Sequence, residues 1–305
     1  MSNAVDLAVV GNLLLDDIVY ADGTTRMGQP GGAALYVALG ASLWPVGVGV
    51  VSRVGDDYPP ELLAELGSRG IDLTGVRPTG GPTMRTWLLY EGRRRRVVHR
   101  LGGPTHTDVS PTVEELPESW RLRAIHLAPM PWSVQRDLVG GLTTRSNTLL
   151  SADPYELLTE HSFDSWCRLF SRIDLLFLSE DEMTIRGALD SPVPVLEQLG
   201  PQNSRRRLAS ILYKRGALGG LHFDTETGKA REWSSRSGEV LDPTGAGDAF
   251  AGGVLAGRLL GETMRRSLDR GVVSASFALE AEGADGLFAA TPEAARDRLL
   301  EWFDH

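Results

Sequence analysis

Short apolar runs that end at glycine or a charged residue recur along the first part of the chain. Residues 5–10 and 46–51 are typical of buried strands, because apolar side chains at successive positions suit a sheet covered on both faces. Between them, residues 33–43 carry apolar positions on a helical period. A second helix is predicted over residues 59–67, which begin with two prolines. This alternation of strand and helix predicts a parallel sheet with crossover helices.

The pattern changes in the next segment. Residues 83–90 and 97–101 flank Glu91-Gly92 and predict an antiparallel hairpin with a charged tip. Further strands are then predicted at residues 124–127, 148–152, 173–178, 208–213 and 219–223, and the chain from Asp248 onward is mostly helical. We therefore expect a single domain over residues 1–305. Its predicted fold is a three-layer α/β/α sandwich with a mainly parallel central sheet and a small β lid near residues 12–27 and 83–104.

Charge and composition narrow the classes of function. The chain has 305 residues, with 31 Lys+Arg against 40 Asp+Glu and a formal net charge of −9. This balance argues against nucleic acid and anionic membrane as partners, since both select basic surfaces. Only Lys214 and Lys229 are lysines, and neither is followed by Ser or Thr. A lysine-containing phosphate loop of the Gly-Lys-Ser/Thr type is therefore excluded.

Cysteine usage and the N-terminal sequence bear on location. Cys167 is the single cysteine, so no internal disulfide or thiolate metal cage can form, which fits a reducing compartment. The first residues lack a basic segment followed by an apolar one, and prolines and glycines interrupt the longest apolar run. We therefore predict a cytoplasmic protein without a membrane segment.

The most informative stretch is a glycine-rich turn that leads into an apolar, helix-compatible segment. Residues 242–250 read Asp-Pro-Thr-Gly-Ala-Gly-Asp-Ala-Phe. The first amides of a helix have no intrahelical acceptor, and the helix dipole adds positive potential there. The amides of Gly245, Ala246 and Gly247 are thus predicted to hold an anion without lysine. Asp248 could accept the proton of a substrate hydroxyl, although an aspartate at this position is also an ordinary helix cap.

This stretch resembles the C-terminal signature of the ribokinase-like, or pfkB, family of carbohydrate kinases. The segment that begins Gly31-Gly32-Ala33-Ala34 and ends Val54-Gly55-Asp56-Asp57 is similar to the family's N-terminal signature, and the order of elements agrees over nearly the whole chain. The resemblance implies transfer of the γ-phosphoryl group of ATP to a hydroxyl of a sugar or sugar-like molecule, with Mg²⁺ bridging the ATP phosphates. It assigns Asp248 as the general base and the amides of Gly245, Ala246 and Gly247 as the anion hole.

An acceptor site also follows from the resemblance. Asp16 and Gly31-Gly32 correspond to positions that contact the acceptor. Tyr36 stands where many sugar-specific members have Asn, so a ring face or a phenol would replace a polar contact. Arg100, close to the four arginines at 93–96, would cover the acceptor or the phosphates, unless this hairpin tip is simply solvated. Hexoses, pentoses, nucleosides and inositol all remain open as acceptors.

The remaining family positions lie at the phosphates and the nucleotide. Ser179 and Glu182 stand where the family has Asn-x-x-Glu, and Asp153 begins an Asp-Pro turn beside the phosphates, so these three are expected to order Mg²⁺ indirectly. Serine is shorter than the expected asparagine, which leaves open a catalytically weak nucleotide or metabolite sensor. The implied nucleotide contacts are Lys214, Gly216, Gly219, Thr244 and Gly283. Family members often form dimers through the lid, so a homodimer is a further expectation.

Overall fold

The computed structural model describes residues 4–91, 94–100, 102–142, 147–188, 191–199 and 208–304. Parts of two predictions lie outside this description. They are Gly92 and Leu101 of the hairpin, and, in the run of four arginines, Arg93 together with the side chains of Arg94 and Arg95.

In these ranges, nine strands form the central sheet in the order β13-β12-β11-β10-β9-β8-β1-β4-β5. All pairs from β11 to β5 are parallel, whereas β12 and β13 add an antiparallel edge. The strands are β1 (Leu7–Val10), β4 (Val48–Val54), β5 (Asp72–Pro78), β8 (Ala124–Leu127), β9 (Leu149–Ala152), β10 (Leu175–Ser179), β11 (Ser210–Lys214), β12 (Gly220–Asp224) and β13 (Lys229–Trp233).

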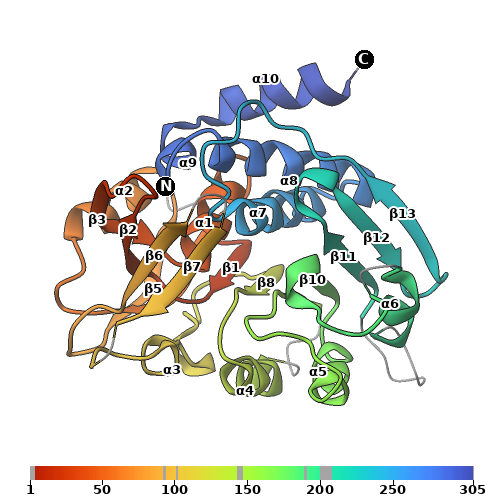
Figure 1. Ribbon diagram of the computed structural model, residues 1–305, viewed down its shortest axis with the longest axis horizontal. Helices are drawn as coiled ribbons and strands as arrows, with labels where there is room; N and C mark the ends of the chain where they lie inside the picture. Colours follow the sequence, from red (N-terminus) through yellow and green to blue (C-terminus); the bar gives the residue numbers. More distant parts are fainter. Residues whose placement is uncertain are drawn as a thin grey trace.

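Helices cover both faces of this sheet (Figure 1). Along β1, Leu7 and Val9 join the apolar core on one face while Ala8 and Val10 join that on the other, as the two-residue period of a strand requires. The first core is covered by α1 (Ala33–Ser42), α2 (Pro60–Ser68), α7 (Ala246–Leu259), α8 (Met264–Leu279), α9 (Asp285–Ala289) and α10 (Pro292–Phe303). The second is covered by α4 (Trp132–Leu142), α5 (Phe163–Phe170) and α6 (Val193–Leu199).

A separate small sheet lies beside this sandwich (Figure 1). Four of the described strands form it in the order β3-β2-β6-β7, and they are β2 (Leu14–Val19), β3 (Thr25–Gly31), β6 (Arg85–Glu91) and β7 (Arg94–His99). β2 pairs with β6 in parallel, whereas the other two pairs are antiparallel. Arg26 of β3 forms ion pairs with Glu282 and Asp285, which fasten the small sheet to the C-terminal helices.

These observations confirm the predicted fold class and the hairpin formed by β6 and β7. The sequence pattern did not reveal β5, because this edge strand carries few buried residues. The mostly helical C-terminal part is confirmed as α7, α8 and α10, and the structure adds the short helix α9 between α8 and α10. Within the described ranges there is no helix with both the length and the apolar character that a membrane crossing requires. One domain over the whole chain, and a dimer through the small sheet, stay predictions.

Candidate active site

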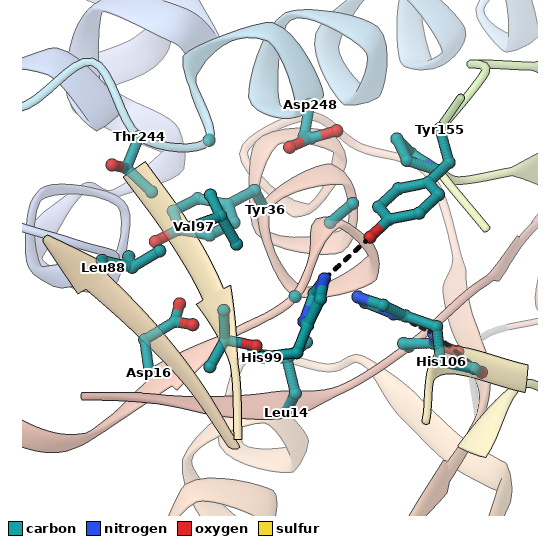
Figure 2. Close-up of a pocket in the computed structure, with 16 residues that line it drawn as sticks. Leu14, Asp16, Tyr36, Leu88, Val97, His99, His106, Tyr155, Thr244 and Asp248 are labelled. Atoms are coloured by element: carbon teal, nitrogen blue, oxygen red, sulfur yellow. Dashed lines mark hydrogen bonds between the residues drawn. The ribbon is translucent and has the colours of Figure 1, made fainter. Parts of the chain in front are cut away.

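A cavity of about 170 Å³ lies between the small sheet and the start of α7 (Figure 2). Asp16 and Leu88 reach it from the small sheet, and Tyr36 reaches it from α1. Asp248 faces it from the first turn of α7. The cavity therefore unites the predicted general base, the predicted acceptor carboxylate and the aromatic residue that departs from the family pattern.

One buried carboxylate, Asp242, fixes the turn before α7. It accepts hydrogen bonds from the Thr244 amide at 2.9 Å, the Gly283 amide at 2.8 Å and the Tyr90 hydroxyl at 2.8 Å. Tyr90 belongs to β6 and lies 2.9 Å from the Thr244 hydroxyl as well. Because Asp242 joins three segments that are distant in sequence, the turn is held in a fixed position relative to the small sheet.

Gly245 permits this turn to lie against Tyr36. It caps α7 with a φ of 71°, in the left-handed region that favours glycine, and a Cβ here would collide with the Tyr36 ring. Ala246 donates a long 3.3 Å hydrogen bond to the Pro243 carbonyl. Gly247 and Asp248 follow in the first helical turn, where amides have no intrahelical acceptor. This helix start can therefore present amide donors to an anion next to the Asp248 carboxylate.

Gly31 and Gly32 shape the acceptor side for different reasons. Gly31 ends β3, and a Cβ there would collide with the Asp16 carboxylate. Gly32 lines the cavity with a φ of 97°, and a Cβ there would collide with the Asn12 carbonyl. Only glycine satisfies both conditions at position 32. The pair thus makes room for Asp16 and for the chain at Asn12.

A charged cluster lies where three neighbouring parallel strands end, and we define it as Asp153, Glu182 and Lys214. Asp153 follows β9, Glu182 follows β10 and Lys214 ends β11. The Lys214 ammonium donates to Asp153 Oδ2 at 2.5 Å, and both side chains are buried. The Ser179 amide donates to Glu182 Oε2 at 2.6 Å, which folds the glutamate back over the strand end. Carboxyl ends of parallel strands are where open α/β sheets bind ligands.

The charged cluster borders the turn before α7. A Cβ on Gly247 would lie 3.4 Å from the Lys214 ammonium nitrogen, so the cation is next to the helix-start amides. Burial lowers the pKa of Lys214, but the Asp153 and Glu182 carboxylates outweigh burial and raise it, which keeps the ammonium charged. Burial raises the pKa of Asp153 against the opposing effect of Lys214. Burial, and then the charge of Asp153, raise the pKa of Glu182.

One oxygen of the charged cluster makes no hydrogen bond to any described residue. Asp153 Oδ1 is buried and has no hydrogen-bond partner among the residues that the structure describes. Those residues also contain no group of three or more His, Cys, Asp or Glu side chains arranged to hold a metal ion. This donor set fits Mg²⁺, which commonly uses one or two carboxylates and takes its other ligands from water and phosphate oxygens.

A second group, which we call the ring cluster, consists of His99, His106 and Tyr155. His99 Nε2 lies 3.1 Å from the Tyr155 hydroxyl, as Figure 2 shows. The His106 ring centroid lies 4.9 Å from those of both His99 and Tyr155. All three line the cavity at the end opposite Asp16 (Figure 2). Sequence reasoning missed the ring cluster, because its members are isolated in the sequence and belong to no motif.

The remaining predicted residues lie elsewhere. Arg100 lines a different cavity of about 190 Å³, which it shares with Arg85. Gly216 and Gly219 form the turn Gly216–Leu218 and its cap between β11 and β12, both with positive φ. Gly283 lies beside Asp242. The structure thus brings together Asp16, Gly32, Tyr36, Thr244, Gly245 and Asp248 around one cavity, with the charged cluster next to it.

Comparison with known proteins finds one family, one relative and two solved structures that resemble this chain. The family described as pfkB family carbohydrate kinase matches residues 6–289. A cytidine kinase from Thermococcus kodakarensis is 32% identical over 282 residues, which cover 87% of this chain and 94% of the relative. A Burkholderia thailandensis nucleoside kinase in complex with inosine shares the fold with a TM-score of 0.75 at 15% identity, covering 98% of each chain. An Arabidopsis thaliana ribokinase complexed with ribose and ATP shares it with a TM-score of 0.73 at 20% identity, covering 97% of this chain and 99% of that one.

Proposed function

This chain belongs to the pfkB family of carbohydrate kinases, and from that premise we propose that it transfers the γ-phosphoryl group of ATP to a hydroxyl of a nucleoside. Membership confirms the resemblance found in the sequence and the class of ATP-dependent phosphotransferases that act on an alcohol. The choice of a nucleoside as the acceptor is the more specific part of this proposal. Nucleosides were one of several acceptor classes that the sequence left open.

The observation that carries this proposal is that the cavity presents both carboxylates and flat rings. Asp16 and Asp248 supply carboxylates for the hydroxyls of a ribose, whereas Tyr36 and the ring cluster supply flat surfaces. A hexose has no flat apolar part to contact those rings. A nucleoside has one hydroxyl-rich part and one flat part, so it matches both ends. The cytidine kinase relative from Thermococcus supports the same choice.

The proposed chemistry begins with Asp248, which accepts the proton of the attacking hydroxyl. Such a general base contributes about 10²- to 10⁴-fold to the rate. Asp16 holds a neighbouring hydroxyl so that the attacking oxygen faces the start of α7. The amides of Gly245, Ala246 and Gly247 stabilise the charge on the transferring phosphoryl group, with the Lys214 ammonium beside them. Positioning and electrostatics thus account for most of the catalysis, as in other phosphoryl transfers.

The charged cluster would hold Mg²⁺ on the phosphate side. When bound with ATP, this ion supplies charge neutralisation at the phosphate oxygens. Asp153 Oδ1 and the Glu182 carboxylate would hold its water ligands, and Ser179 orients Glu182 through its amide. Lys214 holds Asp153 in place through its hydrogen bond and opposes the effect of burial on the Asp153 pKa.

The nucleotide contacts remain proposals as well. Gly216 and Gly219 lie in the turn that follows β11, directly after Lys214. Gly283 and Thr244 meet at Asp242 beside the start of α7. An ATP molecule whose γ-phosphate lies at Gly247 would extend between these two segments.

The test measures ADP release with a panel of acceptors, namely cytidine, uridine, adenosine, ribose, fructose and inositol. We expect a nucleoside to give the highest kcat/KM. Asp248→Asn should lower kcat by about 10³-fold with little change in the acceptor KM. Asp164→Asn is the matched control, since Asp164 occupies the first turn of α5 and is exposed.

Three outcomes would count against the proposal. A sugar that outperforms every nucleoside would reject the acceptor class, and Asp248→Asn turnover within a few fold of wild type would reject the base. Binding of nucleoside and ATP without any ADP formation would favour the alternative that the sequence left open, a catalytically weak nucleotide or metabolite sensor.

A further inference from the structure

We infer that His106 recognises the base of the nucleoside by donating a hydrogen bond from Nε2 to a carbonyl oxygen or an unprotonated ring nitrogen, and that Asn12 sets this direction by fixing the tautomer of the His106 ring. The inference rests on the proposed nucleoside acceptor and adds the hydrogen-bonding pattern that the acceptor must present.

Asn12 determines which nitrogen of His106 carries the proton. Its Nδ2 lies 2.9 Å from His106 Nδ1 and 3.4 Å from the His106 carbonyl oxygen. The Ser110 hydroxyl donates to that carbonyl oxygen at 2.6 Å and lies 3.1 Å from Asn12 Oδ1. An amide nitrogen only donates, so His106 Nδ1 must accept. The neutral ring then carries its single proton on Nε2. Asn12 is buried, at 2% exposure, which keeps this donor in place.

His106 is neutral at physiological pH. Burial, assisted by the neighbouring His99, lowers the pKa of His106 to about 4. The titratable groups that face it are His99 on β7 and Tyr155 after β9, and Asp16 and Asp248 line the same cavity. Within the described part of the chain, His106 Nε2 makes no hydrogen bond, and the ring points into the cavity (Figure 2). A ligand in the cavity therefore meets a single N–H donor of fixed direction.

Thr86 independently indicates that this cavity binds a polar ligand. Its hydroxyl is buried in the wall of the same cavity, with the residue only 3% exposed, and has no hydrogen-bond partner among the described residues. An unpartnered buried hydroxyl destabilises the fold unless a ligand satisfies it. Thr86 lies on β6 opposite both Asp16 and His99, between the carboxylate end and the ring cluster.

The ligand part that fits at His106 is flat. The His99 ring is perpendicular to that of His106, at 90°, and the Tyr155 ring is tilted by 54°, so ring faces surround the donor. Nucleobases carry acceptor atoms in the plane of their rings, and such a ring can accept from Nε2 while it contacts the neighbouring faces. A ribose alone has no part that would meet His106 in this way.

The test pairs deletion of an acceptor atom in the substrate with deletion of the donor in the protein. The substrates are cytidine, adenosine, their deaza analogues, in which one ring nitrogen is replaced by C–H, and 2-thiocytidine, whose sulfur accepts weakly. In the wild type, loss of the matched acceptor should lower kcat/KM by about 10- to 100-fold. His106→Phe should lose this discrimination, whereas His106→Gln, which retains an N–H donor, should keep part of it.

Asn12→Asp provides a readout that a structural role would not give. The carboxylate only accepts, so a neutral His106 would carry its proton on Nδ1 and Nε2 would become an acceptor. The new negative charge also raises the pKa of His106, and below that pKa both nitrogens donate. The preference for cytidine over its matched analogue should therefore persist at low pH and disappear as the pH rises. In the wild type this ratio should not change with pH, and because it is a ratio, the ionisation of Asp248 cancels.

The outcomes separate this inference from the proposed function. Nucleoside turnover whose discrimination is unchanged in His106→Phe overturns the inference alone. A wild type that phosphorylates sugars but neither binds nor phosphorylates nucleosides overturns both. Discrimination that is lost in His106→Phe and becomes pH-dependent in Asn12→Asp is the expected result.

Discussion

The charged cluster and the ring cluster are built in different ways. Asp153, Glu182 and Lys214 follow the ends of adjacent parallel strands, and the backbone register that pairs Ser179 with Lys214 sets their spacing. The ring cluster instead joins side chains from β7, α3 (His106–Val109) and the chain after β9. Backbone topology thus places the charged cluster, whereas side-chain packing places the ring cluster. Substitutions should separate these two kinds of construction.

The largest effect is expected for Lys214→Met. It leaves the buried Asp153 carboxylate without its cation, which should cost about 3–5 kcal/mol of unfolding free energy. It should also lower kcat by about 10²-fold, because a positive charge next to the Gly247 amide is lost. Denaturant unfolding and ADP release measure the two effects. Lys229→Met is the control, since this second lysine is exposed on β13.

A double variant sharpens this prediction. Lys214→Met combined with Asp153→Asn removes both charges, so it should recover much of the lost stability while kcat stays low. Recovery of kcat together with stability would mean that Lys214 acts only by keeping the fold intact.

Gly245→Ala should produce the second-largest effect. Placing alanine at positive φ costs about 1–3 kcal/mol, and the new methyl group must displace the Tyr36 ring. Gly216→Ala carries a similar backbone penalty at φ 53°, but nothing lies within 4 Å of its added Cβ. Gly245→Ala should therefore lose more stability than Gly216→Ala, and only Gly245→Ala should raise the acceptor KM. Equal KM changes would indicate that Tyr36 does not shape the acceptor site.

Thr86→Val should produce a smaller effect with opposite signs for stability and binding. Removing an unpartnered buried hydroxyl should raise the unfolding free energy by about 1 kcal/mol. The acceptor KM should rise by about 5- to 10-fold, because Thr86 lines the acceptor cavity. Thr83→Val is a close control, since its hydroxyl is also buried and unpartnered among the described residues but lies outside that cavity. An unchanged KM in Thr86→Val would remove Thr86 from the acceptor site.

The smallest effect concerns pH and His126, a fully buried side chain whose Nδ1 lies 2.9 Å from the Ser151 hydroxyl. Burial, with a contribution from Lys214, lowers the pKa of His126 to about 3. Below pH 6.5, His126 therefore binds a proton in the unfolded chain but stays neutral in the folded chain. The contribution of His126 to the unfolding free energy is complete above pH 6.5 and declines on acidification. Between pH 7.5 and pH 6, wild type should lose about 0.8 kcal/mol more than His126→Gln. Equal losses in denaturant titrations would contradict this assignment.

The sequence predicts the backbone-built part of the site well. Glycine and apolar spacing around Asp248 identify a turn before a helix, and strand periodicity locates the strand ends that precede Asp153 and Ser179. Parallel strands then bring those ends together at one edge of the sheet. The pairing of Lys214 with Asp153 could not be predicted, because it depends on side-chain burial and direction.

The ring cluster shows where such prediction fails. His99, His106 and Tyr155 lie on separate elements, and no local period relates them. Their meeting depends on the packing of β7, α3 and the chain after β9, which the hairpin pattern alone does not predict. The sequence did not predict β5 for a related reason. An edge strand with little buried surface lacks the apolar pattern of a core strand.

The pairing of β2 with β6 has a consequence for how the molecule is made. It joins Asp16 to Thr86, both of which line the cavity, and Thr244, Gly245 and Asp248 complete the wall. A nascent chain on the ribosome therefore cannot bind the acceptor until almost its entire length has been synthesised. Such non-local closure is slow, and any ligand of this cavity binds only the finished fold. Nucleoside binding should thus raise the melting temperature of the whole molecule and act as a signal that folding is complete.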